Sequence, residues 1–188
     1  MSIHSLAKTL RWSGLAAFCI AAPILAATLQ ADPAKSTVSA TFKQLNVPVS
    51  ASFKKFTAQI DYDAAKPETS KANVDIEIGS FDLGDPDYNK EVMKKEWFNA
   101  AQFPKASFVS SQIRSGGAGK LDVTGKLTIK GKTTEVRFPL TVSKDGASQV
   151  FDGTLPIKRL TYDIGDGEWK DTSVVADEVL IKFHIVAK

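Results

Sequence analysis

The residues that could do chemistry begin with a set of oxygen-bearing side chains near the middle of the chain. Four of them have the spacing of the first, third, fifth and last ligands of a calcium-binding EF-hand loop: Asp85, Asp87, Asn89 and Glu96. That loop requires glycine in its sixth position for a sharp turn, and Lys90 stands there. Asp85 followed by Pro86 is instead typical of a helix start, with a capping Asp and Pro in the first turn. We therefore expect a short helix over about residues 86–96 and no metal site.

Nucleophilic chemistry has few candidates. The chain has one cysteine, Cys19, and two histidines, His4 and His184. His184 alternates with apolar residues near the C-terminus, so it is expected to face away from them, and no G-x-S-x-G motif is present. The glycines of Gly165–Trp169 lack the lysine and following helix of a phosphate-binding loop, so a long hairpin turn is expected there. We predict no catalytic residues.

Acidic and basic side chains are nearly balanced. The formal net charge of +3 is too small to indicate a nucleic-acid-binding surface. Five acids that might work in pairs fall on polar strand faces or in turns: Asp61, Asp63, Asp75, Asp122 and Asp152. Because carboxylates tuned for acid–base catalysis need apolar surroundings, this placement favours solubility.

The first 27 residues are typical of a secretory signal peptide. Lys8 and Arg11 precede an apolar run that ends in small residues, and Pro23 interrupts the run before it reaches the length of a membrane span. Phe18 before Cys19 argues against a lipoprotein anchor. We expect cleavage after Ala27, with Ala31 as second choice, and a periplasmic domain over residues 28–188.

The rest of the chain alternates between apolar and polar residues with a period of two. The pattern is clear over 121–129, 136–142 and 179–185, and it breaks once, over Phe53–Phe56, where we expect a bend or bulge. Turn signals such as Lys130-Gly131 and Asp145-Gly146 separate the runs and predict a meander after Ala106. About eight strands with one apolar face each predict an antiparallel up-and-down β-barrel, which leaves no exposed sheet edge.

The inward faces are rich in phenylalanine. Such a set can fill a core or line a cavity for an apolar ligand, and composition alone does not separate the two. Alternation predicts the lining as Phe42, Phe53, Ile60, Phe108, Leu127, Phe138, Leu140 and Phe183. Trp97, Phe98 and Phe103 lie outside any strand and are expected to form a mouth or lid.

Three stretches carry a resemblance that spans residues 28–188. They are VPVSASFKKFTAQIDY (47–62), residues 82–108 with Phe103-Pro-Lys-Ala-Ser-Phe108, and LDVTGKLTIKG (121–131). In this order and spacing they resemble the YceI-like family of bacterial periplasmic proteins. The resemblance implies a lipocalin-like barrel whose apolar tunnel binds polyisoprenoids or other long-chain amphiphiles, such as isoprenoid quinones. It carries no catalytic motif.

Three hypotheses follow. The first is a non-enzymatic periplasmic carrier of an isoprenoid or quinone-like lipid, with the polar head at the mouth near Tyr88 or Lys94. The second, a lipid-modifying enzyme, has little support because His184 faces outward. The third is a partner protein with a filled core that docks on a cytochrome b561-like membrane redox complex. Tunnel openings and strand edges can also support a dimer, but nothing in the sequence requires one.

Overall fold

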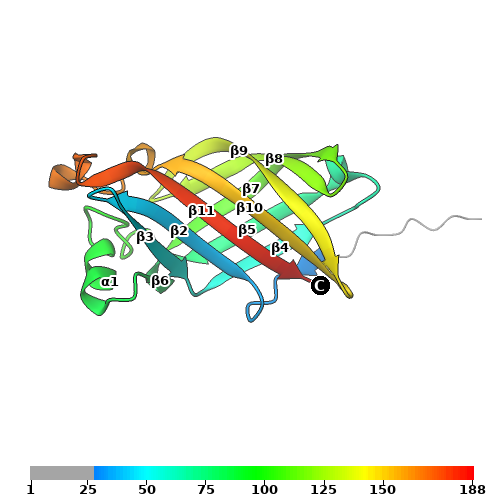
Figure 1. Cartoon of the computed structure of the whole chain (residues 1–188), viewed down its shortest axis with the longest axis horizontal. Coiled ribbons are helices and arrows are strands. Elements are labelled where there is room, and N and C mark those ends of the chain that lie inside the picture. The colour runs from blue at the N-terminus through cyan, green and yellow to red at the C-terminus, as the bar shows by residue number, and fades with distance from the viewer. Residues whose placement is uncertain (1–27) are drawn as a thin grey trace, which may run out of the picture.

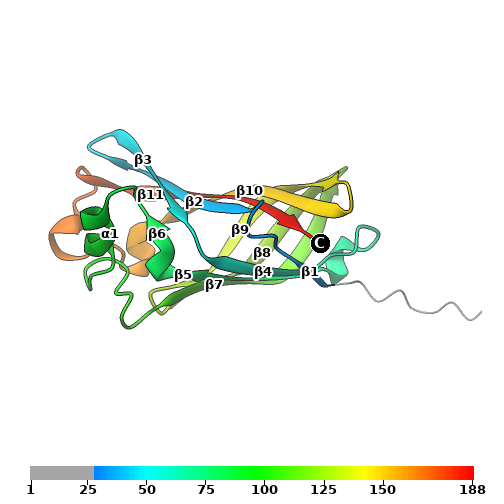
Figure 2. The same cartoon turned by 90° about the horizontal axis from the view of Figure 1, so that it is seen from below.

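The computed structural model describes residues 28–188 and shows an elongated barrel made from one antiparallel sheet (Figures 1 and 2). Its strands are β1 (Thr28–Gln30), β2 (Thr37–Gln44), β3 (Val47–Phe53), β4 (Phe56–Asp61), β5 (Lys71–Glu77), β6 (Phe81–Asp82), β7 (Lys105–Gly117), β8 (Lys120–Ile129), β9 (Lys132–Asp145), β10 (Ser148–Lys158) and β11 (Val175–Ala187). The helix is α1 (Pro86–Val92), and short 3₁₀ helices span Pro67–Thr69, Ile78–Ser80, Arg159–Tyr162 and Gly167–Lys170. The all-β class and the barrel agree with the prediction.

The sheet has 11 strands, not about eight. The difference arises because two strands are broken. β3 leads directly into β4 through Lys54-Lys55, at the predicted bend, and β5 leads into β6 through the 3₁₀ helix Ile78–Ser80. β4 pairs with β5 and β3 pairs with β6, so the two broken strands turn the same corner together. The three-residue β1 is a further addition that alternation over so short a segment does not reveal.

Two features bring the two sides of the sheet together into a barrel. β3 and β4 lie at different points of the strand order, yet they are consecutive in the chain, which brings the sheet round on itself. At the C-terminal end of the barrel, β1 pairs with β4 while Gln30 and Lys188 exchange backbone hydrogen bonds of 2.9 and 3.1 Å. These contacts leave little unpaired backbone between β11 and β4 at that end.

The predicted meander is confirmed. From β7 onwards each strand pairs with the next one along the chain, through to β11. Along β8, buried and less buried residues alternate, and Val123 is 2% exposed. This alternation points one row of side chains into the barrel interior.

α1 is shorter than expected. Asp85 caps it as predicted, because its carboxylate accepts hydrogen bonds from the backbone N–H groups of Asp87 and Tyr88. The helix ends at Val92, not at Glu96. The carbonyl of Val92 accepts from the N–H of Phe98, so the chain turns back at the point where a longer helix would continue. That turn brings Trp97 and Phe98 to the barrel end nearest α1.

Gly165–Trp169 lies in the long β10–β11 connection, as expected, and part of it forms the 3₁₀ helix Gly167–Lys170. The predicted signal peptide and its cleavage site after Ala27 lie outside the described residues. Within residues 28–188, none of the helices has the length and apolar character needed to cross a membrane.

Candidate functional site

The barrel interior contains an apolar cavity in the half of the barrel where the C-terminus lies. We call it the tail cavity. The volume of this cavity is about 120 Å³. Apart from the side chains of Tyr62 and Ser70, its walls are apolar. The lining residues are Val38, Ala58, Ile60, Tyr62, Ser70, Ala72, Val74, Ile76, Phe108, Ile113, Leu121, Val123, Leu127, Phe138, Leu140, Phe151, Leu155, Ile181, Phe183 and Ile185.

A second cavity, which we call the head cavity, lies at the end of the barrel near α1. The volume of this second cavity is about 80 Å³. Ile181 lines both cavities, so they share a wall inside one barrel. The lining residues are Ala40, Phe42, Phe53, Phe81, Val92, Trp97, Phe98, Ile129, Ile157, Arg159, Ile164, Val175, Val179 and Ile181.

The predicted lining residues all reach the interior but divide between the two cavities. Six line the tail cavity: Ile60, Phe108, Leu127, Phe138, Leu140 and Phe183. Phe42 and Phe53 line the head cavity, together with the predicted mouth residues Trp97 and Phe98. Strand alternation placed the first eight correctly because it fixes the face of each side chain, but it does not fix their height in the barrel.

The other two residues expected at the mouth line neither cavity. Tyr88 is on α1, 63% exposed, and lines neither cavity. Phe103 packs against the β8–β9 turn, where a Cβ on Gly131 would lie only 2.7 Å from its ring. Their expected place at a mouth therefore stays a prediction. Neither residue belongs to a strand, so no periodicity constrained its direction.

The aromatic rings form two groups that match the two cavities. In the tail cavity, Phe138 packs against Phe108 and Phe183 with ring centroids 5.5 and 5.6 Å apart. Near the head cavity, Phe81 packs against Phe53 and Phe98 at 4.8 and 5.2 Å. These tilted and edge-on contacts stiffen the walls beyond what apolar burial alone provides.

Arg159 is a buried cation in the wall of the head cavity. It is 2% exposed, and its five guanidinium N–H groups donate to the backbone carbonyls of Ile164, Gly165, Trp169, Val175 and Ala176. Burial lowers the pKa of Arg159, and the negative charge of Asp177 acts in the opposite direction. The guanidinium lies 6.0 Å from the centre of the Trp97 ring.

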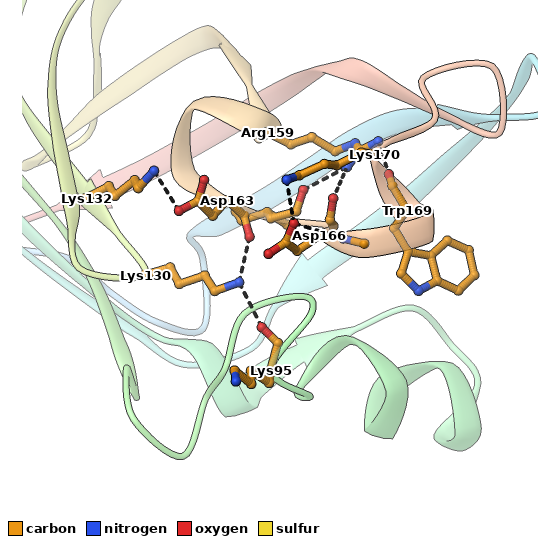
Figure 3. A network of polar contacts seen from close by, with 11 residues as sticks. Lys95, Lys130, Lys132, Arg159, Asp163, Asp166, Trp169 and Lys170 are labelled. Atoms are coloured by element: carbon orange, nitrogen blue, oxygen red, sulfur yellow. Dashed lines mark hydrogen bonds and ion pairs between the residues drawn. The ribbon is translucent and has the colours of Figure 1, made fainter.

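Lys130 ties together the two loops that bear Trp97 and Arg159 (Figure 3). Its Nζ donates to the carbonyls of Lys95, at 2.9 Å, and Asp163, at 2.6 Å. Burial lowers the pKa of Lys130, and the nearby Asp163 opposes this shift. The N–H groups of Gly165 and Asp166 also donate to the carbonyl of Glu96. The Trp97 loop is therefore held against the β10–β11 connection.

Sequence reasoning missed Arg159, although a signal was present. Leu155, Ile157 and Arg159 stand at alternate positions of one strand run, and the first two face inward. An arginine at the next inward-facing position must be buried, and its guanidinium group then needs hydrogen-bond partners inside the protein. Buried arginines are rare, so this position could have been recognised as unusual. Phe151 and Ile181 also line the tail cavity and follow the same alternation.

Outside the cavities, His184 and Asp152 form the pair of polar side chains that most resembles part of a catalytic site. His184 faces outward, as predicted, and its Nδ1 lies 2.6 Å from Asp152 Oδ1 across β10 and β11. Both side chains are about half exposed. Residues 28–188 hold no group of three or more His, Cys, Asp or Glu side chains placed to bind a metal ion.

The fold is that of one protein family. Residues 29–187 match the model of the YceI-like domain, so the chain belongs to the YceI-like family. A crystal structure of Burkholderia cenocepacia BcnA is 56% identical, with a TM-score of 0.82 over 84% of this chain and 99% of that one.

More distant relatives share the fold. The YceI protein of Campylobacter jejuni is 23% identical, with a TM-score of 0.67 over 73% of this chain and 83% of that one. A polyisoprenoid binding domain from Saccharophagus degradans, implicated in plant cell wall breakdown, is 19% identical with a TM-score of 0.69, over 87% and 98%. A UPF0312 protein of Pseudomonas fluorescens is 37% identical over 98 residues, 52% of this chain and 51% of its own length. The chain spans about half the length of the curated relatives it matches.

Proposed function

We propose that this protein binds a long-chain isoprenoid lipid, such as an isoprenoid quinone, inside the barrel and carries it without changing it chemically. The observation that carries the proposal is the pair of apolar cavities that share Ile181. Each methylene moved from water into such a space contributes ~0.8 kcal/mol. A chain of several isoprene units therefore gains enough from burial alone to bind. Family membership and the description of the Saccharophagus domain support the same ligand class.

The alternatives fit the geometry less well. A docking protein with a filled core does not need two apolar cavities inside its barrel. A lipid-modifying enzyme would need reactive side chains facing the ligand, and the His184–Asp152 pair lies on the outer face. Export to the periplasm, supported by the N-terminal pattern, and contact with a membrane redox protein, supported by the family resemblance, remain parts of the proposal. Subcellular fractionation and the mass of the mature protein test the first of these.

The direct test is native mass spectrometry of the protein isolated from its own cells, with solvent extraction of the same sample. The proposal expects a stoichiometric adduct whose extracted mass is that of an isoprenoid lipid. A clean unliganded mass, together with no uptake of an added prenylated quinone, would contradict it.

A pair of matched variants separates cavity binding from surface adhesion. Val74 lines the tail cavity, whereas Val109, on the neighbouring strand, is 50% exposed. Val74→Trp fills part of the cavity and is expected to lower lipid occupancy roughly tenfold or more, which corresponds to about 1.4 kcal/mol. Val109→Trp adds the same group outside and should leave occupancy unchanged. Equal losses in both variants would indicate nonspecific binding.

A further inference from the structure

The β2–β3 hairpin ends in two apolar side chains that the barrel does not cover, in a segment that we call the hairpin tip (residues 43–47). Leu45 is 65% exposed and Val47 is 62% exposed, and neither lines a cavity. Figure 2 shows the hairpin projecting from the barrel at the end where α1 and the exposed Tyr88 lie. Within residues 28–188, the other exposed large apolar residue is Val109, on the barrel wall. Exposed apolar groups that gather at one end mark an interaction surface.

The turn of the hairpin contains a residue that does not suit its backbone. Leu45 has a φ of 49° and Asn46 a φ of 63°, so both lie in the left-handed region. Asparagine and glycine tolerate that region, whereas a leucine there is sterically disfavoured. The backbone N–H of Leu45 donates to the carbonyl of Val174 at 2.8 Å, which holds the turn in place. An exposed leucine that does not favour its own turn is explained by contact with another surface.

The hairpin carries one charge. From Thr37 to Phe53, Lys43 is the one ionisable side chain, and there is no carboxylate. Lys43 is exposed and makes no ion pair within residues 28–188. The tip can therefore enter an apolar layer without burying an ion, while Lys43 stays at the level of phosphate groups.

The shape and edge of the hairpin favour a lipid surface over a protein partner. The tip is a convex projection, which a fluid bilayer accommodates without a matching groove. Beyond its pairing with β2, β3 meets β6 only at Ser52 and Phe53, so a partner protein could add a strand along the rest of that edge. A proline in a strand has its missing N–H at the free edge, so Pro48 removes a donor that such a strand would use.

The apolar inner face of the hairpin runs from the tip into the barrel. Alternation places Val47, Val49 and Ala51 on one face of β3, and Ala51 is buried in the core. Phe42, which pairs with Val49 across the hairpin, lines the head cavity. The uncovered tip is therefore continuous with the wall of the apolar interior.

We infer that the hairpin tip docks the protein on a phospholipid bilayer. Leu45 and Val47 insert into the interfacial layer, Lys43 contacts lipid phosphates, and Tyr88 lies at the same end of the barrel. Docking in this way brings the α1 end next to the membrane that would supply or receive a lipid. That purpose rests on the proposed function, whereas the docking itself can be measured without a lipid in the barrel.

The first test is co-sedimentation of the protein isolated from its own cells with vesicles of phosphatidylethanolamine and phosphatidylglycerol. Wild type should bind. Leu45→Asn combined with Val47→Thr should weaken binding roughly tenfold or more, because two apolar side chains no longer leave water. Asparagine suits the left-handed turn and threonine suits a strand, so this double variant should keep the hairpin. Val109→Thr, the matched control, changes an exposed apolar residue on the barrel wall and should bind as wild type does.

Two further measurements locate the contact and its electrostatic part. In bicelles of the same lipids, with a spin label near the lipid head group, the amide signals of residues 44–47 in wild-type protein should broaden. Those of the Asp145-Gly146 turn, at the other end of the barrel, should not. Lys43→Gln should weaken vesicle binding about fivefold at low salt and reduce its salt dependence.

Three results would overturn the inference. If wild type does not bind vesicles, or if the double variant binds as tightly as wild type, the hairpin tip does not dock. If Lys43→Gln abolishes binding and the double variant keeps it, the protein adsorbs by charge alone. If wild type self-associates without binding vesicles and the double variant stays monomeric, the tip is a contact between copies of this chain.

Native mass spectrometry separates a failure of docking from a failure of the proposed function. A bound lipid in protein that ignores vesicles removes the docking and leaves the carrier role. Vesicle binding that depends on Leu45 and Val47, in protein that never holds a lipid, supports the docking and removes the carrier role. The double variant should keep the lipid content of wild type, because neither residue lines a cavity.

Discussion

Gly125 shows how closely side chains are fitted at single positions of the barrel wall. It occupies an inward position of β8, and the Phe108 ring lies over it from β7. A Cβ on Gly125 would lie 2.5 Å from Phe108 Cζ and 2.5 Å from the carbonyl oxygen of Val109. Glycine there makes room for an aromatic ring that lines the tail cavity.

We expect Gly125→Ala to lower the free energy of unfolding by ~1–3 kcal/mol, because Phe108 and the backbone of β7 must both move. Gly79→Ala is the matched control, since a Cβ on Gly79 meets no atom within 4 Å. Urea unfolding of both variants measures the difference. Similar stability of the two would show that Phe108 can relax freely.

Residue type accounts for what sequence could predict at this scale. Large apolar residues at alternate positions were placed on the inner face correctly, from Phe42 to Phe183. The burial of Trp97 Nε1 without a partner and the carbonyl groups around Arg159 could not be predicted from the sequence. Both depend on how distant loops pack together, which no local pattern encodes.

At the scale of elements, the short helix α1 depends on its first residue. Asp85 Oδ1 accepts from Asp87 N at 2.8 Å and from Tyr88 N at 3.2 Å. Asp85→Ala should destabilise the helix by ~1 kcal/mol and speed hydrogen exchange of the α1 amides. Asp87→Ala removes only an exposed ion pair and a charge near the helix start, so its effect should be smaller. Equal effects would argue against the cap.

A hydrogen bond between Asn89 of α1 and Asp82 of β6 fixes the helix to the sheet and affects the pKa of Asp82. Hydrogen bonds from Asn89 Nδ2, at 3.0 Å, and from the backbone N–H of Gly84, at 2.9 Å, lower the pKa of Asp82. Because the folded pKa lies below the unfolded one, the stabilisation is present above the ordinary aspartate pKa. It is lost as the pH falls through the folded value.

Replacing Asn89 should therefore raise the pKa of Asp82 towards its ordinary value. A pH titration of the Asp82 carboxyl ¹³C resonance in Asn89→Leu measures this shift. Asn73→Leu, an exposed change on β5, should leave the titration as it is in wild type. An unchanged Asp82 titration in Asn89→Leu would mean that the hydrogen bond does not form in solution.

The boundaries of the elements were harder to predict than their existence. Alternation located the long strands and the bend at Lys54-Lys55. The end of α1 at Val92 was missed because residues 93–96 are good helix formers, and tertiary packing of Trp97 and Phe98 turns the chain earlier. Two of the three additional strands come from breaks at which the pairing partner changes, and the third is the short β1.

For the whole molecule, the cavities link lipid content to stability. A ligand that binds only the folded barrel raises the free energy of unfolding by about 2.7 kcal/mol at one hundred times its dissociation constant. Protein stripped of lipid by solvent-free detergent exchange should therefore melt at a lower temperature than protein as isolated. Adding a prenylated quinone back should restore the melting temperature. A melting temperature that ignores both treatments would contradict a bound lipid inside the barrel.

For the whole molecule, the barrel architecture could be predicted from the sequence, but whether its interior is filled or hollow could not. Strands with one apolar face must cover that face, and short turns favour a meander, so the architecture follows from local patterns. Whether the interior is filled depends on the summed side-chain volume against the barrel radius. That balance is set by the pairing of all the strands together.

The pairing of Gln30 with Lys188 places both ends of the described chain at one end of the barrel, while α1 and the head cavity lie at the other (Figure 1). A tag placed at either end of the described chain therefore orients the barrel in the same way on a surface. A protein anchored to a sensor chip through a C-terminal tag, or fused behind another domain at Thr28, would present the Trp97 end to the solution in either case. The same proximity makes the chain suitable for circular permutation, with a short linker across the old ends and new termini opened in the exposed turn at Asp145-Gly146.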